Sequence, residues 1–382
     1  MNNRKLLVTG GAGFIGANFV HYWMKRYPED RIIVLDALTY AGNLESLKPI
    51  ASNRNYEFVR GDIGDQVLVE RLLREARIDT IVHFAAESHV DRSILGPDAF
   101  IETNIVGTHT LLKAAKGVWL DGVSRPVRHR FHHVSTDEVY GSLSATAPAF
   151  KETTPYDPSS PYSASKAASD HLVRAYHRTY GLEVTISNCS NNYGPYHFPE
   201  KLVPLTIINV LDGQPICVYG DGMNVRDWLY VEDHCRGIEC ILERGVDGET
   251  YNIGGQNEGT NIALVSAICR LLDEAFVRDG GLHQRFPDSP AGKGTGAQSL
   301  ITFVKDRPGH DRRYAINAER IQKQLGFQPQ EAFETGLKKT IDWYLGNEAW
   351  WRGVMDGSYH GWIETQYING MRGDYQTVLG PN

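Results

Sequence analysis

Short apolar runs alternate with amphipathic stretches through the first half of the chain. The runs rich in β-forming residues, which predict strands, lie at residues 5–9, 31–35, 56–59, 80–84, 131–134 and 184–187. Between them, apolar residues recur at helical spacing over residues 14–26, 67–75, 99–116 and 162–180. Mostly apolar strands that alternate with helices are typical of a parallel sheet covered on both faces. We therefore predict an α/β fold with a doubly wound parallel sheet.

The pattern changes after about residue 191, where turn formers and aromatic residues replace the regular alternation. Short strands and helices then mix with loops, and two later segments resemble returns to the first unit. We expect two interleaved domains. The first is predicted to hold residues 1–190, 226–256 and 312–330, and the second, a smaller α/β domain, residues 191–225, 257–311 and 331–382. Residues 279–299 are dense in glycine, proline and serine and are predicted to form a surface insertion.

Composition excludes several classes of partner. The 382 residues carry a net charge of −7, which gives no reason to expect nucleic acid as a partner. The five cysteines are odd in number and form no CxxC pair, so neither a disulfide framework nor a zinc site is predicted. No apolar stretch approaches the length of a membrane span or a signal-peptide core. We expect a cytoplasmic protein that uses no metal and binds neither membranes nor nucleic acid.

A glycine-rich turn follows the first predicted strand and opens the first predicted helix. In Gly11-Ala-Gly-Phe-Ile-Gly16 the glycines allow a tight turn, close approach of a pyrophosphate and close packing of helix on sheet. The helix N-terminus then offers free N–H groups to the phosphates. Asp36 ends the next strand, where a carboxylate binds ribose hydroxyls and repels a 2′-phosphate. The sequence therefore predicts a Rossmann-type fold that binds NAD rather than NADP.

Further cofactor contacts are expected at the ends of the following strands. Asp62 ends the third strand, where it either reaches the adenine or caps the next helix. Ala85 and Ala86 follow the fourth strand, and their small side chains allow close approach of the dinucleotide, although small residues also simply pack well. The residues that we predict from this region are Gly10, Gly13, Phe14, Ile15, Gly16, Asp36, Ala37, Leu38, Thr39, Asp62, Ile63, Ala85 and Ala86.

Tyr162 and Lys166 stand four residues apart, so they share one face of a helix that Pro161 suits as its first residue. Tyrosine has a pKa of about 10 and is a poor base at neutral pH. A lysine ammonium ~4 Å away favours the phenolate by up to about 4 kcal/mol at an effective dielectric constant near 20. This pair therefore predicts a tyrosine base assisted by a lysine.

Thr136-Asp137-Glu138 ends another predicted strand. Two adjacent carboxylates are usually a solvated turn, but beside a hydride acceptor and a tyrosine base they can supply the acid and the base for elimination of water. Neighbouring carboxylates raise each other's pKa, and burial of one separates their roles. The sequence leaves open which one is raised. If the strand continued, Asp137 would point away from Thr136 and Glu138, so both carboxylates can serve one substrate only if the strand ends here.

Together these motifs resemble the dTDP-glucose 4,6-dehydratases of the extended short-chain dehydrogenase/reductase superfamily. The likeness runs from about residue 5 to about residue 362. Its main departure is the glycine-rich insertion before Leu300. It rests on residues 9–16, 83–93, 135–141, 162–166, 191–204, 226–234, 251–255 and 306–313.

The resemblance implies a reaction in three stages, which serves deoxysugar biosynthesis. Tyr162, helped by Thr136 and Lys166, takes the proton of the sugar 4-hydroxyl while a hydride passes from C4 to NAD. Glu138 then removes the C5 proton and Asp137 protonates the departing 6-hydroxyl. The hydride returns to C6 and C5 is reprotonated, which yields a 4-keto-6-deoxy sugar nucleotide.

The resemblance also implies binding residues and an assembly. Thr103 and Asn192, with Tyr162 and Lys166, are placed on the cofactor side. The helices at residues 99–116 and 162–180 pair across a two-fold axis in this family, which implies a homodimer. Around the dTDP-glucose substrate it places Ser88, Thr136, Asn191, Lys201, Leu202, Cys217, Val218, Tyr219, Arg226, Asn261, Asp306, Arg307, Pro308, Gly309 and His310.

Structural interpretations of some of these residues stay open. Arg226 could form only an ion pair with Asp227, Asn261 could cap a helix, and Cys217, Val218 and Tyr219 could be ordinary strand residues. Three other functions remain as well. A sugar-nucleotide 4-epimerase shares the fold but needs no acid–base carboxylate pair, and a GDP-mannose dehydratase typically favours NADP, which Asp36 opposes. A non-catalytic dinucleotide-binding regulator tends to lose the tyrosine or the lysine. The choice between thymine and uracil is also left open, since it depends on one methyl contact.

Overall fold

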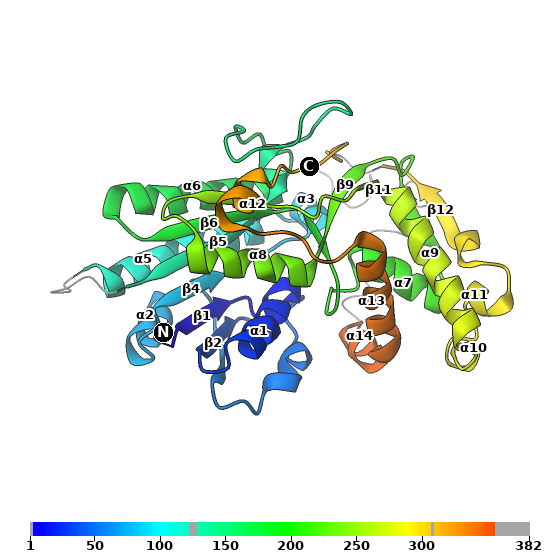
Figure 1. Cartoon of the computed structure of the whole chain (residues 1–382), viewed down its shortest axis with the longest axis horizontal. Helices are drawn as coiled ribbons and strands as arrows, with labels where there is room; N and C mark the ends of the chain where they lie inside the picture. Colours follow the sequence, from blue (N-terminus) through cyan, green and yellow to red (C-terminus); the bar gives the residue numbers. More distant parts are fainter. Residues whose placement is uncertain (1–2, 122–127, 307–308, 356–382) are drawn as a thin grey trace, which may run out of the picture.

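A seven-stranded parallel sheet forms the centre of the computed structural model, which describes residues 3–121, 128–306 and 309–355 (Figure 1). In spatial order the strands are β3 (Tyr56–Arg60), β2 (Arg31–Asp36), β1 (Lys5–Thr9), β4 (Thr80–His83), β5 (Arg130–Thr136), β6 (Val184–Cys189) and β10 (Thr250–Ile253). Strand order runs outward from β1 in both directions, so the chain reverses between β1 and β4. In such sheets ligands bind outside the carboxyl ends of the strands at this switch point.

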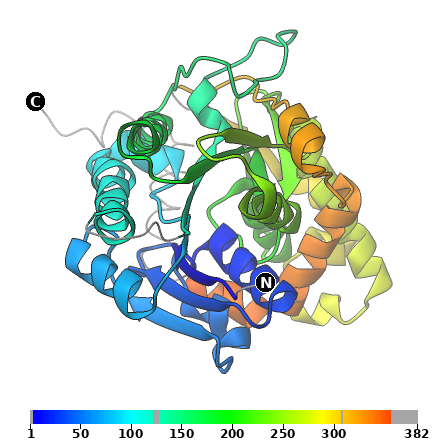
Figure 2. The same cartoon turned by 60° about the vertical axis from the view of Figure 1, so that its left-hand side comes forward.

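Helices cover both faces of the sheet, as Figure 2 shows. Residues of β1 alternate between the two faces, with Leu6 and Val8 in one core and Leu7 in the other. The first core packs under α1 (Phe14–Arg26), α8 (Val231–Arg244) and α12 (Glu319–Leu325). The second packs under α2 (Gln66–Glu75), α5 (Thr108–Trp119) and α6 (Pro161–Tyr180). The predicted doubly wound α/β fold is confirmed.

Short helices lie in the connections that follow the carboxyl ends of the strands. They are η1 (Leu44–Ile50), α3 (Val90–Leu95), α4 (Asp98–Phe100), the π-helical η2 (Ile101–Gly107) that runs into α5, and η3 (Asp137–Tyr140). The strands and helices expected from the sequence in residues 5–187 are all present, with ends that differ by a few residues. The agreement follows because strands buried on both faces are short continuous apolar runs, whereas the helices that cover them carry apolar residues at helical spacing.

A third core lies beside the sheet, at the right of Figure 1. It is built mainly on the helices α7 (Leu202–Leu211), α9 (Asn261–Arg278), α13 (Phe333–Gly346) and α14 (Glu348–Val354). Its strands are β7 (Asn191–Tyr193), β9 (Val225–Tyr230) and β11 (Glu258–Thr260) in one small sheet, and β8 (Ile216–Tyr219) and β12 (Ile301–Val304) in another. Trp351, Tyr344 and Phe276 are fully buried there.

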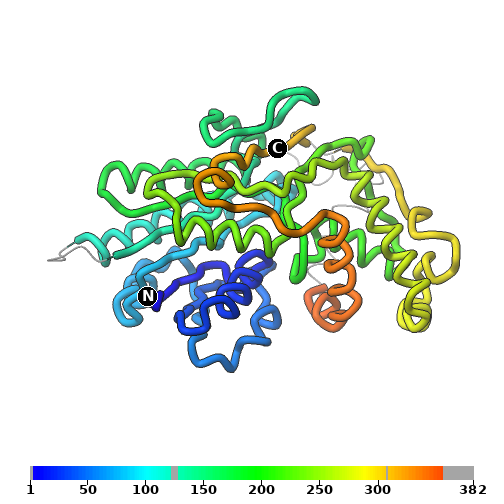
Figure 3. The backbone as a smooth tube through the Cα atoms, viewed as in Figure 1, coloured from blue at the N-terminus to red at the C-terminus, as the bar shows by residue number. Residues whose placement is uncertain are grey.

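The chain crosses between the two bodies more than once, as the tube in Figure 3 shows. After β9 it returns as α8, which packs beside α1, and then as β10 at the sheet edge. It returns again as α12, which packs on α8 and β10. Because each body has its own apolar core, we propose the interleaved division predicted above as the domain organisation of the described residues. The parts of that prediction at residues 1–2, 122–127, 307–308 and 356–382 lie outside the described residues.

The glycine-rich segment 279–299 is folded rather than a structureless loop. It forms α10 (Leu282–Arg285) and α11 (Pro290–Lys293) and leads into η4 (Ala297–Leu300). Leu282, Phe286 and Ala297 are buried in the third core, and the Ala297 amide donates to Asp273 of α9 at 3.0 Å. These apolar anchors fasten the segment to α9, which its composition alone did not indicate.

Within the described ranges, no helix combines the length and apolarity needed to cross a membrane, and no group of three or more possible metal ligands occurs. All five cysteines are free thiols. Asn188, whose sequence fits a glycosylation site, is fully buried in β6.

Candidate active site

A cavity of about 450 Å³ opens at the carboxyl ends of β1, β2, β4, β5 and β6 and extends to the third core. Most of the predicted cofactor and substrate residues lie on its wall. From the cofactor set these are Gly10, Gly13, Phe14, Ile15, Gly16, Asp36, Ala37, Thr39, Asp62, Ile63, Ala85, Ala86, Thr103, Tyr162, Lys166 and Asn192. From the substrate set these are Ser88, Thr136, Asn191, Lys201, Leu202, Cys217, Val218, Tyr219, Arg226, Asn261 and His310.

The glycine-rich turn brings α1 against the end of β1. Gly10 has φ +69°, a conformation that side chains rarely adopt, and its amide donates to the Leu35 carbonyl at 2.9 Å. A Cβ on Gly16 would lie 2.3 Å from the Gly10 carbonyl oxygen, so only glycine permits this packing. The N-terminus of α1 therefore opens onto the cavity with its first amides close to the wall, as a pyrophosphate requires.

Asp36 is held at the end of β2 by two amides. Its Oδ2 accepts from Ala12 N at 2.9 Å and its Oδ1 from Leu38 N at 2.8 Å. Burial raises the pKa of this carboxyl, while the two backbone hydrogen bonds act in the opposite direction. Asp36 thus offers a fixed acceptor at the cavity wall, which fits the ribose hydroxyls of NAD.

Asp62 and the cap of α2 are separate residues. Asp65 is the N-cap of α2, where its side chain accepts from Leu68 N at 2.9 Å. Asp62 instead accepts from Gly64 N at 2.6 Å and stands on the cavity wall. The capping interpretation of Asp62 is therefore wrong for this helix, and its place on the wall is compatible with an adenine contact.

Tyr162 and Lys166 lie in the first turns of α6. Ser160 caps this helix in a reciprocal pair with Ser163, and Pro161 is its first residue. The Lys166 ammonium donates to the carbonyl of Val134 in β5 at 2.8 Å. Burial lowers the pKa of Lys166 to about 8. Burial, with a smaller contribution from the Glu138 charge, raises the pKa of Tyr162, so a base role for the phenol depends on nearby cations.

Strand β5 ends at Thr136, and the chain turns into η3 at Asp137. Thr136 caps this turn, since its hydroxyl accepts from Glu138 N at 3.3 Å. Because the strand ends here, Asp137 and Glu138 are not forced to opposite faces of the sheet, as an acid–base pair acting on one substrate requires.

The two carboxylates have different surroundings. Glu138 stands on the cavity wall, whereas Asp137 is 1% exposed behind it. The Oδ2 atom of Asp137 has no hydrogen-bond partner among the described residues. Burial, followed by the charges of Glu138 and Asp227, raises the pKa of Asp137 well above its ordinary value. The structure therefore identifies Asp137 as a carboxyl that keeps its proton more readily than usual.

Two asparagines present unsatisfied oxygens at the cavity. The Oδ1 atoms of Asn191 and Asn261 are buried without a hydrogen-bond partner in the described part of the chain. Thr260, not Asn261, caps α9, because its hydroxyl accepts from Ala263 N at 3.3 Å. Buried polar atoms are almost always hydrogen-bonded, so these two atoms point to a bound polar ligand.

Arg226 is placed by main-chain oxygens and an aromatic ring. Its guanidinium donates to the carbonyls of Val225 and Asp311 at 2.8 and 3.0 Å and lies 4.3 Å from the centre of the Tyr314 ring. Asp227 accepts from the amides of Gly255 and Asn257 instead. This arrangement fixes one forked cation at the cavity wall, which suits a phosphate.

Several predicted residues lie elsewhere. Leu38 packs against the core under α1 with φ +55°, and Gly309 is outside the cavity wall. Asp306 is also outside it and contacts His310 Nδ1 at 2.6 Å. Arg307 and Pro308 fall outside the described residues.

A charged cluster that no sequence pattern predicted lies where α3 and the loop after β4 meet the segment before α7. Glu200 is 2% exposed and accepts from Arg92 at 3.0 Å, and the Arg92 guanidinium lies 4.1 Å from the centre of the Tyr40 ring. Glu87 is on the same wall, and burial raises its pKa. These residues belong to no recognised spacing. The one available signal was that Glu200 directly precedes Lys201.

Known proteins resemble the chain over nearly its whole length. The family model described as GDP-mannose 4,6 dehydratase matches residues 7–340. The dTDP-glucose 4,6-dehydratase of Neisseria meningitidis serogroup B is 56% identical over 357 residues, which are 93% of this chain and 97% of that protein.

Solved structures agree with this relationship. The dTDP-glucose 4,6-dehydratase DesIV from Streptomyces venezuelae, solved with NAD bound, is 47% identical with a TM-score of 0.79, over 92% of this chain and 99% of that one. The Bacillus anthracis enzyme in complex with NAD is 45% identical with a TM-score of 0.78, over the same shares. The chain therefore belongs to the GDP-mannose 4,6 dehydratase family, and within that family to the dTDP-glucose 4,6-dehydratases.

Proposed function

We propose that the chain carries out the reaction of an NAD-dependent dTDP-glucose 4,6-dehydratase with Thr136, Asp137, Glu138, Tyr162 and Lys166 as its catalytic residues. The observation that supports the proposal is that these residues come together at the carboxyl ends of the strands. The end of β5, the turn η3 and the start of α6 bring a buried high-pKa carboxyl, a wall carboxylate and a Tyr–Lys pair beside the dinucleotide turn. The products are dTDP-4-keto-6-deoxyglucose and water.

The first stage is oxidation at C4. Tyr162 takes the proton of the 4-hydroxyl, and the positive charge of Lys166 stabilises the phenolate that this requires. The Thr136 hydroxyl at the end of β5 assists as a hydrogen-bond partner. The turn Gly10–Gly16 and Asp36 would hold NAD, which would supply the acceptor for the C4 hydride and its return to C6.

Elimination of water follows, because a ketone at C4 makes the C5 proton acidic. Glu138 removes this proton from the cavity wall. Asp137 supplies the proton that leaves with the 6-hydroxyl, which its burial and raised pKa favour. Glu138 then returns a proton to C5. Tyr162 has gained a proton and Asp137 has lost one, so both exchange with solvent before the next turnover.

The remaining wall binds the sugar nucleotide. We assign the diphosphate to Arg226. Asn191 and Asn261 are assigned as hydrogen-bond partners of the substrate, because their buried Oδ1 atoms have no hydrogen-bond partner among the described residues. Lys201, which donates to the Ser88 carbonyl at 3.1 Å, stands beside the same space. Leu202, Cys217, Val218, Tyr219 and His310 complete the predicted contacts on the described wall.

A homodimer is the proposed assembly. Five large apolar or aromatic side chains are 41–52% exposed on the neighbouring elements α3, η2 and α6. They are Ile94, Leu95, Ile101, Val106 and Tyr180. Exposed large apolar side chains on neighbouring elements are typical of an interaction site, and covering them with a second copy removes them from water. Light scattering after size exclusion should give twice the chain mass of 42.7 kDa, and a mass of 42.7 kDa would contradict the dimer.

The cytoplasm is the proposed location. All five cysteines are free, and free thiols persist in reducing compartments.

Mass spectrometry of dTDP-glucose incubated with the protein in heavy water, without added cofactor, tests the function. We expect loss of one water, one deuterium at C5 and no accumulation of NADH, because the hydride stays within the reaction. An unchanged mass with a galactose product would replace the proposal with a 4-epimerase. No conversion, even after NAD is supplied, would contradict dehydratase activity on this substrate.

A further inference from the structure

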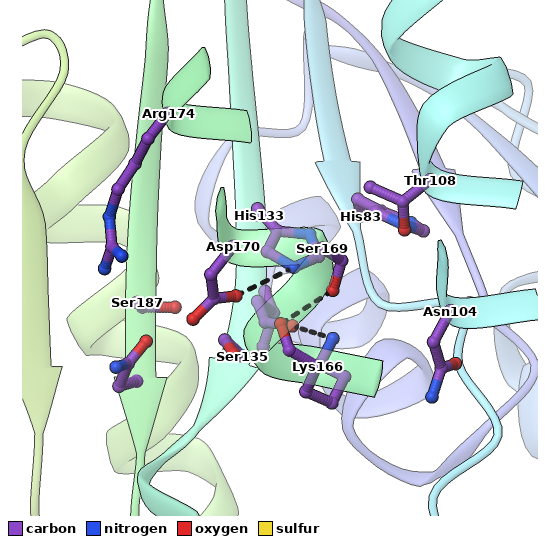
Figure 4. A network of polar contacts seen from close by, with 12 residues as sticks. His83, Asn104, Thr108, His133, Ser135, Lys166, Ser169, Asp170, Arg174 and Ser187 are labelled. Atoms are coloured by element: carbon purple, nitrogen blue, oxygen red, sulfur yellow. Dashed lines mark hydrogen bonds and ion pairs between the residues drawn. The ribbon is translucent and has the colours of Figure 1, made fainter. Parts of the chain in front are cut away.

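Helix α6 carries a row of functional side chains behind the cavity. Tyr162, Lys166, Asp170 and Arg174 follow one another at intervals of four residues, so they lie along one face. Lys166 is 4% exposed and Asp170 is fully buried. Figure 4 shows Lys166, Asp170 and Arg174 in sequence along this helix, with His133 of β5 beside Asp170. The row places a buried anion one helical turn behind the catalytic lysine.

Asp170 is fixed from two further elements. The hydroxyl of Tyr156, in the loop before α6, donates to its Oδ2 at 2.8 Å. The Nε2 atom of His133 lies 3.2 Å from its Oδ1. Tyr156 is itself held by Arg174, which donates to the same hydroxyl at 2.6 Å. A side chain held from helix, strand and loop has little freedom to turn away from Lys166.

Asp170 is an anion in these surroundings. Burial opposes its charge, but contact with His133 and the cations Lys166 and Arg174 outweigh burial and lower its pKa. Burial lowers the pKa of His133 to about 4, so its imidazole is neutral near pH 7 and cannot neutralise the carboxylate. The positive charges that face Asp170 are therefore Lys166 and Arg174.

We infer that Asp170 is a positioning residue for the dehydratase: its carboxylate is the buried counter-charge that keeps Lys166 protonated, one helical turn from Tyr162. The inference rests on the proposed function of the Tyr162–Lys166 pair. Without an anion nearby, an ammonium removed from water would lose its proton more readily. The Lys166 hydrogen bond to the Val134 carbonyl fixes its direction but adds no charge.

Other titratable groups around this pair do not replace Asp170. Cys189 of β6 is a buried thiol whose pKa is raised by burial, and His83 of β4 has a pKa lowered by burial, so both are neutral near pH 7. Burial also raises the pKa values of Tyr140, Tyr156 and Tyr162. Asp137 is buried with a raised pKa, and the charge of Glu138, on the cavity wall, raises the pKa of Tyr162.

The test is the pH dependence of turnover in Asp170→Asn. Asparagine has the same shape and can still accept from Tyr156, but it carries no charge. The alkaline limb of kcat, set by loss of the Lys166 proton, should move to lower pH by about one unit, the lower end of the effect expected for an opposite charge one turn away. Asp170→Ser, a second neutral variant, should move the limb in the same direction. Asp170→Glu should restore it towards the wild-type position.

Asp233→Asn is the matched control. Asp233 is also fully buried and accepts from Arg236 and from the amides of Gln330 and Glu331, but it lies in α8, away from the cavity wall. Its loss should lower stability without moving the pH limb. A folded Asp170→Asn enzyme whose turnover falls equally at every pH, with an unmoved limb, would overturn the inference. Absence of the keto sugar from wild-type protein at every pH would instead contradict the proposed function.

Discussion

Replacement of Gly16 by alanine should separate the dinucleotide turn from α1. The new Cβ would lie 2.3 Å from the Gly10 carbonyl oxygen and 2.8 Å from Gly11 Cα, whereas ordinary contacts begin near 3.4 Å. Gly10 cannot yield, because it is itself packed against Ala85 and bonded to Leu35. The start of α1 must therefore move outward by about 1 Å, at a cost of roughly 1–3 kcal/mol.

This cost should appear in NAD binding. If the turn relieves the overlap by opening, NAD must close it again, and 1–3 kcal/mol corresponds to about 5- to 150-fold weaker binding. Isothermal titration calorimetry on protein stripped of cofactor measures this, with a thermal melt to record stability. Gly16→Ala protein with wild-type NAD affinity and an unchanged melting temperature would refute the packing argument.

Gly117→Ala is the matched control for this substitution. Gly117 lies inside α5, where an added Cβ would meet, among the described residues, only Glu70 Oε1, at 3.9 Å. Alanine is favoured over glycine in a helix interior by roughly 0.5–1 kcal/mol. We therefore expect a slightly higher melting temperature and unchanged NAD affinity, opposite in sign to Gly16→Ala for stability.

Three further changes test the proposed chemistry and the third core. Glu138→Gln should fold normally but abolish deuterium uptake at C5, as read by mass spectrometry, and undiminished uptake would remove Glu138 from the mechanism. Asp137→Asn should slow elimination yet raise the free energy of unfolding at pH 7 by on the order of 1 kcal/mol. Because burial raises the pKa of Asp137, the folded wild-type protein keeps a proton there that the unfolded chain releases above pH 3.8. The gain in melting temperature should therefore vanish below about pH 4. Trp351→Ala should cost about 3–5 kcal/mol in denaturant unfolding, since Trp351 is fully buried and donates to the Tyr344 carbonyl at 3.0 Å; a cost below 1 kcal/mol would show that the core collapses around it.

The sequence by itself determined the layered α/β body. Strands such as Lys5–Thr9 are visible because burial on both faces of a sheet makes them short continuous apolar runs, and helices such as Phe14–Arg26 are visible because one buried face gives apolar residues at helical spacing. The dinucleotide turn was also predictable, because a tight turn and close packing between strand and helix require glycines within a segment of six residues. Family resemblance added the roles of residues that no local pattern distinguishes, such as Asn191 and Asn261.

Only the tertiary structure decided which carboxyl of the pair is buried. Asp137 and Glu138 are equivalent in sequence, and their difference arises because β5 ends at Thr136 and the chain turns into η3 among distant segments. The same holds for Asp170, whose partners Tyr156 and His133 come from a loop and a strand outside its helix. Burial and charge at a site depend on contacts between segments far apart in the chain, and those contacts have no local signature in the sequence.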